Sequence, residues 1–182
     1  MNIFSAILEN PKEYIHFADR EPGEVLIFLL RKHPITNLPW IITTIILIML
    51  PTALNYVLLT SEINLPSQFG LVTNFIFYLF AAIYSFESFL IWYYNVYIVT
   101  DRRLIDIDFY GFFYKKVSET QYDKLEDTTY SQSGVAEILF NYGNVFVQTA
   151  AEKNEFEFIS IPAPQRVYDK ITDLIAKSKN HE

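Results

Sequence analysis

The sequence predicts an α+β membrane protein in which a two-helix transmembrane hairpin interrupts a small β-sheet domain, and a C-terminal helix caps that domain. Residues 38–59 and 70–94 are long apolar stretches whose only charged side chain is Glu87, as is typical of membrane-spanning helices. After Tyr94 the pattern changes to the alternation of apolar and polar residues that is typical of strands. Near the C-terminus apolar residues return at helical spacing, namely Val167, Ile171, Leu174 and Ile175.

The composition excludes several classes of protein. Hydrophobic residues make up 51% of the 182 residues, and their excess lies in residues 38–94, which leaves enough chain for one small β domain. The chain has no cysteine, which excludes disulfide bonds, a thiolate nucleophile and cysteine-based metal sites. The net charge is −7 and the basic residues are scattered, whereas nucleic-acid binding needs clustered cations that neutralise phosphates. We therefore expect no nucleic-acid partner.

Each apolar stretch is long enough to cross a bilayer as a helix. Residues 38–59 form an uncharged run of 22 residues, and a helix rises about 1.5 Å per residue against a hydrocarbon core of about 30 Å. The short loop TSEINLPSQF joins the two stretches, which predicts an antiparallel hairpin, and Pro51 predicts a kink in the first helix. A buried hairpin of a soluble protein fits less well, because two such runs are rare in so small a soluble chain. A cleaved signal peptide also fits less well, because the first run starts far from Met1.

The flanking charges predict the orientation of the hairpin. Arg31 and Lys32 precede the first helix and Arg102 and Arg103 follow the second, whereas the connecting loop has no lysine or arginine. Because cytoplasmic flanks carry the excess of positive charge, we expect both termini in the cytoplasm. The sequence therefore predicts a multi-pass protein of the cell membrane, with residues 1–20 as an N-terminal cytoplasmic segment.

Seven strand-like segments predict the β domain. Six of them lie in residues 95–178, at Val96–Thr100, Leu104–Phe109, Lys115–Tyr122, Leu125–Ser131, Asn144–Thr149 and Phe156–Ile161. The segment EVLIFLLRKH within residues 21–37 has the composition of a helix or of a buried strand. If it is a strand, it is the seventh, and the transmembrane hairpin at residues 38–94 is an insertion in the sheet domain. Gly134 is interpreted as a break between strands, with a single helical turn at residues 134–140 as the alternative. The residues after Pro164 are interpreted as the capping helix.

The segment Leu104–Phe109 is interpreted as a half-buried strand. Its side chains are expected to alternate between core-facing Ile105, Ile107 and Phe109 and solvent-facing Leu104, Asp106 and Asp108. The two aspartates have no base or electrophile beside them in the sequence. We therefore interpret them as groups that keep the sheet soluble, and not as acid–base catalysts.

Four segments together resemble the bacterial pleckstrin-homology (PH) family, specifically its YdbS-like membrane group. They are EPGEVLIFLLRKHP, YIVTDRRLIDID, LFNYGNVFVQTA and ISIPAPQRVYDKI, and the two apolar helices follow the first of them. The resemblance covers residues 21–175 and implies a seven-stranded, strongly bent, barrel-like β-sheet capped by a C-terminal helix. It implies no particular activity, because this fold serves many binding roles.

The cations that flank the hairpin are candidate lipid contacts. Arg31, Lys32, Arg102 and Arg103 are interpreted as topogenic charges that make weak contacts with anionic headgroups. A specific phosphoinositide site needs a concave cluster of several cations, and the turn near Arg102 and Arg103 adds few. We therefore expect general attraction to membrane lipids and not recognition of one headgroup.

Glu87 is the candidate for an intramembrane functional residue, because a charge in a spanning helix is costly. Its structural interpretation is a carboxyl group near the inner interface that is protonated, reaches toward water or accepts hydrogen bonds. A transport or export component that uses Glu87 would place a polar side chain opposite it, drawn from Thr43, Thr44, Thr52 and Asn55.

The aromatic segment YGFFY is the candidate protein contact, through Tyr110, Phe112, Phe113 and Tyr114, and the alternative for these rings is packing in the core or at the membrane interface. The histidines lack metal-ligand spacing and no nucleophile or phosphate-binding motif is present, so we expect no catalytic residue, metal or cofactor. The sequence thus predicts a non-enzymatic, membrane-anchored interaction or assembly module that binds a protein partner or a second copy of itself. The alternatives are binding of anionic lipid in the inner leaflet and a small transport component.

Overall fold

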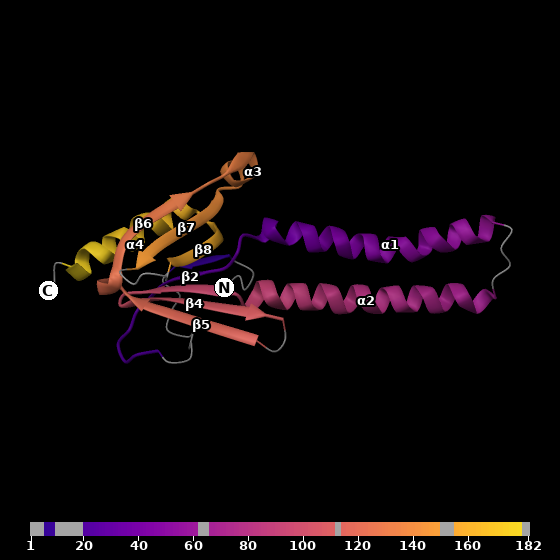
Figure 1. Ribbon diagram of the computed structural model, residues 1–182, viewed down its shortest axis with the longest axis horizontal. Coiled ribbons are helices and arrows are strands. Elements are labelled where there is room, and N and C mark those ends of the chain that lie inside the picture. Colours follow the sequence, from indigo (N-terminus) through magenta and orange to yellow (C-terminus); the bar gives the residue numbers. More distant parts are fainter. Residues whose placement is uncertain (1–5, 10–19, 62–65, 112–113, 150–154, 180–182) are drawn as a thin grey trace. The chain divides into compact units, whose positions relative to one another are not determined.

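The computed structural model describes residues 6–9, 20–61, 66–111, 114–149 and 155–179. The chain divides into two compact units (Figure 1). We call Met1–Pro34 together with Tyr93–Glu182 the β-unit, and Ile35–Trp92 the helical unit.

The helical unit is a pair of long apolar helices. A short 3-10 helix, η1 (Pro34–Asn37), leads into α1 (Leu38–Thr60), and α2 (Ser67–Tyr94) follows. Helix α1 continues through Pro51. By length and composition alone both helices are able to cross a membrane, and most of their large apolar side chains are exposed.

Polar contacts between the two helices show that they run antiparallel. Asn55 Nδ2 donates a hydrogen bond to Asn74 Oδ1 at 2.8 Å. One turn earlier on α1, Thr52 Oγ1 lies 3.4 Å from the hydroxyl of Tyr78, which is one turn later on α2. Side-chain hydrogen bonds of this kind are typical of helices that pack in lipid, where each contributes about 0.6 kcal/mol.

The β-unit holds two antiparallel sheets with three short or capping helices. The five-stranded sheet has the order β1-β2-β3-β4-β5 and the three-stranded sheet the order β6-β7-β8. The strands are β1 (Ile7–Glu9), β2 (Leu26–Leu30), β3 (Val96–Thr100), β4 (Arg103–Tyr110), β5 (Tyr114–Gln121), β6 (Leu125–Ser131), β7 (Tyr142–Thr149) and β8 (Glu155–Pro162). The helices are η2 (Tyr122–Lys124), α3 (Gly134–Leu139) and α4 (Pro164–Lys179).

The seven predicted strands, the helical turn before Asn141 and the C-terminal helix are all confirmed. The structure adds an eighth strand, β1, which pairs with β2 and which the sequence does not predict. Three residues are too few to display an alternating pattern, so the sequence carries no signal for this strand.

Strands β2 and β3 are neighbours in the sheet although the helical unit separates them in sequence. They pair antiparallel, with Leu30 opposite Tyr97. The helical unit is therefore inserted in the connection between two adjacent strands. It begins shortly after β2 ends, and it ends shortly before β3 begins.

The main core lies between the two sheets and α4. Helix α4 packs against β6 and β7 and buries Val167, Ile171 and Ile175. Its partners include fully buried side chains of both sheets, namely Leu30, Val99, Leu104, Val145, Val147 and Phe158. Tyr97 and Phe158 join the two sheets, with ring centroids 4.8 Å apart.

The other face of the five-stranded sheet is also apolar, and this corrects a sequence prediction. Leu104 was expected to face solvent, but it is fully buried in the main core. Ile105 instead belongs to a second buried cluster with Leu26 and Ile98, and Ile107 packs against it. The first three residues of β4 are buried on both faces, so alternation of apolar and polar residues cannot report its orientation there.

Candidate functional site

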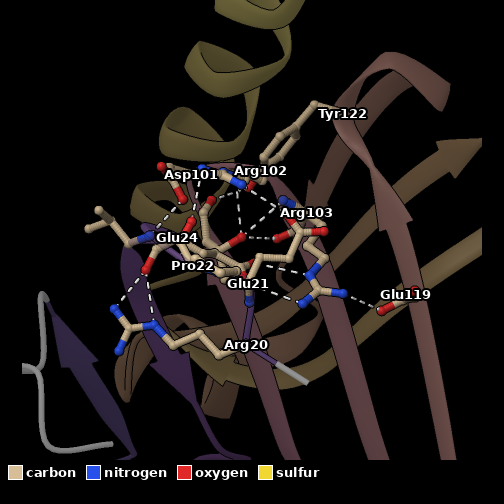
Figure 2. A network of polar contacts seen from close by, with 11 residues as sticks. Arg20, Glu21, Pro22, Glu24, Asp101, Arg102, Arg103, Glu119 and Tyr122 are labelled. Carbon is tan, nitrogen blue, oxygen red and sulfur yellow. Dashed lines mark hydrogen bonds and ion pairs between the residues drawn. The ribbon is translucent and has the colours of Figure 1, made fainter. Parts of the chain in front are cut away.

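A buried ion pair connects the segment before the helical unit to the segment after it (Figure 2). Arg103, the first residue of β4, donates from Nε to Glu24 Oε1 at 3.0 Å and from Nη2 to Glu24 Oε2 at 3.1 Å. Its Nη1 donates to Glu119 Oε2 on β5 at 2.7 Å. The Glu24 residue is 0% exposed, so the pair is shielded from water. We call Glu24, Arg103 and Glu119 the clasp.

Backbone and hydroxyl groups complete the polar surroundings of the clasp. Glu24 Oε2 also accepts from the Glu21 N–H at 3.0 Å, and Arg20 donates to the Glu24 carbonyl from two guanidinium nitrogens. The buried Thr100 hydroxyl accepts from the Arg103 N–H at 2.9 Å, and the Tyr122 hydroxyl donates to the Thr100 carbonyl at 2.7 Å. A buried charge is tolerated only when its polar partners are present, as they are here.

The clasp sets the protonation of its members. Burial raises the pKa of Glu24, but the hydrogen bonds from Arg103 and from the Glu21 N–H outweigh burial and hold that pKa below its usual value. The hydrogen bond and charge of Glu24 raise the pKa of Arg103. Both groups are therefore charged at neutral pH, and the clasp is a structural ion pair.

The four predicted headgroup cations lie at two different ends of the β-unit. Arg102 forms an exposed ion pair with Glu21 at 2.8 Å, beside the clasp. Arg102 and Arg103 follow β3, whereas Tyr94 precedes it, and the five residues of β3 span about 16 Å. Arg31 and Lys32 lie at the opposite end, where the chain enters the helical unit. Headgroup contact by the four residues stays a prediction, and the structure does not bring them together.

Arg31 is held by the residue at which the chain returns from the helical unit. Its Nε donates to the Tyr93 carbonyl at 2.9 Å, and its guanidinium lies over the Tyr93 ring, 4.6 Å from the centroid. The residue is 9% exposed, and burial lowers its pKa. Arg31 therefore fastens the outgoing and returning chains to each other.

Asp106 is a carboxyl group with a strongly raised pKa in the described part of the β-unit. It is half-buried opposite Tyr97, and its Oδ1 is buried without a hydrogen-bond partner among the residues that the structure describes. Burial, followed by the charge of Asp108, raises its pKa to about 7, against the opposing effects of Lys116 and Lys32. The prediction of a solvent-facing aspartate is therefore wrong at Asp106, because its carboxyl group lies on the core-facing side of β4 beside Tyr97.

The raised pKa of Asp106 predicts a stability that depends on pH. Because the pKa is 3.8 in the unfolded chain and about 7 in the folded one, the folded state binds the extra proton between these values. The free energy of unfolding should therefore fall as pH rises through this window. Asp106→Asn removes the titration, so the stability of the variant relative to wild type should rise from pH 4 to about 7 and then level off. Urea unfolding of both proteins at a series of pH values measures this difference, and a constant difference would contradict the prediction.

The exposed aromatic residues of the predicted protein contact sit at the β4–β5 hairpin turn. Tyr110 and Tyr114 are both exposed, and their ring centroids are 5.7 Å apart. Phe112 and Phe113 lie outside the described residues. Strand β5 pairs with β4 on one side, and it is the last strand of its sheet in the order that the described residues form.

Glu87 is half-buried on α2, and the described part of the chain gives it no hydrogen bond or ion pair. The hydroxyls of Thr43 and Thr44 donate to the carbonyls of Pro39 and Trp40 in their own helix. The hydrogen-bonding groups of Thr52 and Asn55 contact α2 at Tyr78 and Asn74. The transport hypothesis for Glu87 stays a prediction, and these contacts give it no support.

A shallow groove of about 270 Å³ lies in the β-unit beside α4. Its polar lining mixes both charges, with Lys170, Asp169 and Asp173 beside an ion pair in which Arg166 Nη1 lies 2.6 Å from Glu9 Oε1. Within the described ranges, no three metal-binding side chains come together. The groove therefore has no cluster of one charge that would select an ionic ligand.

Sequence reasoning misses two features of this unit. The first is Glu24, whose position in EPGE indicates a turn but not that Arg103, 79 residues later, will bury it. The second is a set of exposed apolar side chains on and beside α3, namely Val135, Ile138, Leu139 and Phe140. Their pattern in the sequence is also typical of core residues, because periodicity indicates that a helix has an apolar face but not whether another element covers that face.

Comparison with known proteins identifies a similar family. The family model described as bacterial PH domain matches residues 34–175 of the chain. Among solved structures, a DUF1696 family protein with a pleckstrin-homology domain from Shewanella loihica PV-4 is 16% identical, with a TM-score of 0.35. The match covers 46% of this chain and 68% of that chain. No curated protein matches the sequence.

Proposed function

The chain belongs to the bacterial PH domain family, and we propose that it is a membrane-anchored, non-catalytic interaction or assembly module on the cytoplasmic face. The helical unit is its anchor, and the β-unit presents the interaction surface. The family match confirms the resemblance drawn from the sequence, while the YdbS-like grouping stays a prediction.

The exposed apolar surface of the helical unit supports the anchor. In the most apolar 18-residue stretch of each helix, only 6% is buried within the protein. The exposed side chains of these stretches therefore need to be covered by lipid or by other helices. The basic residues Arg31 and Lys32 stand just before the helical unit, and the residues between the helices include no lysine or arginine. This charge distribution supports a hairpin whose two ends and whole β-unit lie in the cytoplasm.

The free edge of β5 is the observation that carries the interaction role. This strand has eight residues, and its described pairing is with β4 alone. An unpaired edge offers backbone donors and acceptors to an added strand. Val117 on this strand is an exposed apolar side chain, while Lys116 opposes indiscriminate pairing and favours an acidic partner strand.

Site-specific photocrosslinking in native membranes tests this role. A photoreactive amino acid at Val117 should give one discrete adduct, either with a second copy of the chain or with one protein partner. The same amino acid at Lys177, an exposed position on α4, serves as the matched control and should give no discrete adduct. Equal adduct patterns at the two positions, or lipid adducts alone at Val117, would contradict a protein-binding edge.

A further inference from the structure

Two exposed apolar protrusions lie at the end of the β-unit where the chain passes to and from the helical unit. The first is the β4–β5 turn, and the second is α3 with the residue that follows it. The first connects two strands of the five-stranded sheet, and the second connects β6 to β7 in the three-stranded sheet. Their common position is therefore not a result of belonging to one hairpin. We call them the turn protrusion (Tyr110 and Tyr114) and the α3 protrusion (Val135, Ile138, Leu139 and Phe140).

The register of the five-stranded sheet locates the turn protrusion. Strand β3 begins two residues after Tyr94, and its first residue, Val96, pairs with Ile107 of β4. The β4–β5 pairing continues to Tyr110 opposite Tyr114, three residues further. The paired residues Tyr110 and Tyr114 therefore lie about 10 Å beyond the start of β3, on the side from which the chain enters that strand.

Direct contacts tie this overhang to the end of α2. The Phe109 N–H donates to Asn95 Oδ1 at 2.6 Å, and the rings of Phe109 and Tyr94 lie 5.6 Å apart. Lys115 Nζ lies 5.8 Å from the centroid of the Phe109 ring, so a cation stands beside the exposed aromatic rings. All of these residues belong to the β-unit, so the placement does not depend on how the two units are arranged.

The α3 protrusion is tied to the outgoing chain in the same way. The ring of Tyr142, at the start of β7 just after α3, stacks on the His33 ring with centroids 5.2 Å apart. The His33 N–H donates to the Ser160 carbonyl at 2.7 Å, and Pro34 follows as the last residue of the β-unit before the chain enters the helical unit. The four apolar side chains of the α3 protrusion are between 49% and 82% exposed.

We propose that the turn protrusion and the α3 protrusion insert into the headgroup region of the bilayer that holds the helical unit, and so dock the β-unit on the membrane. The inference rests on the proposed function, because it requires the helices to span that bilayer. Tyrosine rings favour the membrane interface, and the large apolar side chains that the described part of the unit leaves exposed are stabilised on leaving water. Lys115, beside these rings, adds attraction to anionic lipid.

Fluorescence quenching by lipid tests the docking. The chain has no cysteine, so Tyr110→Cys and Ile138→Cys each carry one thiol for an environment-sensitive dye. Each full-length variant is reconstituted in vesicles of phosphatidylcholine and phosphatidylglycerol, with and without lipid that bears a quencher near its headgroup. Quenching at both positions should exceed, several-fold, that of Arg102→Cys and Lys177→Cys, two exposed controls away from this end.

Each outcome of this experiment has a distinct meaning. Quenching at positions 110 and 138 no greater than at the two controls would overturn the docking. If the protein nevertheless resists extraction by alkaline carbonate, the anchor stands and only the docking falls. Protein released by carbonate would remove the anchor and the docking together. A blue shift that vanishes on dilution of protein in lipid, without quenching, would assign the protrusions to a second copy and would also overturn the inference.

Discussion

Replacing Arg103 with alanine is expected to lower the free energy of unfolding of the β-unit by about 3–5 kcal/mol, the usual result of removing one partner of a buried ion pair. The variant leaves the Glu24 carboxylate fully buried without the guanidinium that donates two hydrogen bonds to it. The backbone N–H of Glu21 also donates to this carboxylate, but it carries no charge and cannot neutralise it. Glu119 also loses its partner, but that side chain is 60% exposed and water replaces the contact at little cost.

Arg102→Ala is the matched control for this prediction. Arg102 is the adjacent residue and also pairs with a glutamate, but both side chains of that pair are about half exposed. Its loss should change the free energy of unfolding by no more than about 0.5 kcal/mol. Urea titrations in mild detergent, followed by far-ultraviolet circular dichroism, compare the two variants.

A double variant separates burial of charge from simple loss of contacts. Glu24→Gln combined with Arg103→Met removes both charges, and it should be more stable than Arg103→Ala. If Arg103→Ala were as stable as Arg102→Ala, the clasp would not hold the two segments of the β-unit together.

The strands and helices were the part of the structure that the sequence predicted best. Alternation after Tyr94 identified six strands, and the long uncharged runs identified the two apolar helices, because each pattern follows directly from the period of its element. The pattern failed at Leu104 and Asp106. Both faces of β4 are covered at its start, so alternation does not show which face Leu104 occupies. The sequence also does not distinguish an aspartate on the core-facing side, such as Asp106, from an aspartate in water.

The candidate site was predicted less well, because it depends on contacts between distant segments. Arg102 and Arg103 directly follow β3 in the sequence and looked close to the membrane, yet the length of β3 carries them to the other end of the β-unit. Glu24 and Arg103 are 79 residues apart in the sequence, with the whole helical unit between them. Spacing in the sequence predicts neither the separation of Arg102 and Arg103 from Tyr94 nor the contact between Glu24 and Arg103. Both follow from the pairing and register of the strands in the structure.

The proposed function requires that the helical unit crosses the cytoplasmic membrane once in each direction and leaves the β-unit in the cytoplasm. Because the natural chain has no cysteine, single cysteines report the side of the membrane on which they lie. Ser61→Cys lies at the end of α1, in the connection between the helices. Val25→Cys and Lys177→Cys lie at exposed positions in the β-unit, before and after the helical unit.

The deciding measurement is labelling of these three variants with a membrane-impermeant maleimide, in intact cells and in permeabilised cells. We expect Ser61→Cys to be labelled in intact cells, whereas Val25→Cys and Lys177→Cys should be labelled only after permeabilisation. Labelling of all three only after permeabilisation would show that the helices do not cross the membrane. Labelling of Val25→Cys and Lys177→Cys in intact cells would place the β-unit outside the cytoplasm, and either result would overturn the proposed topology.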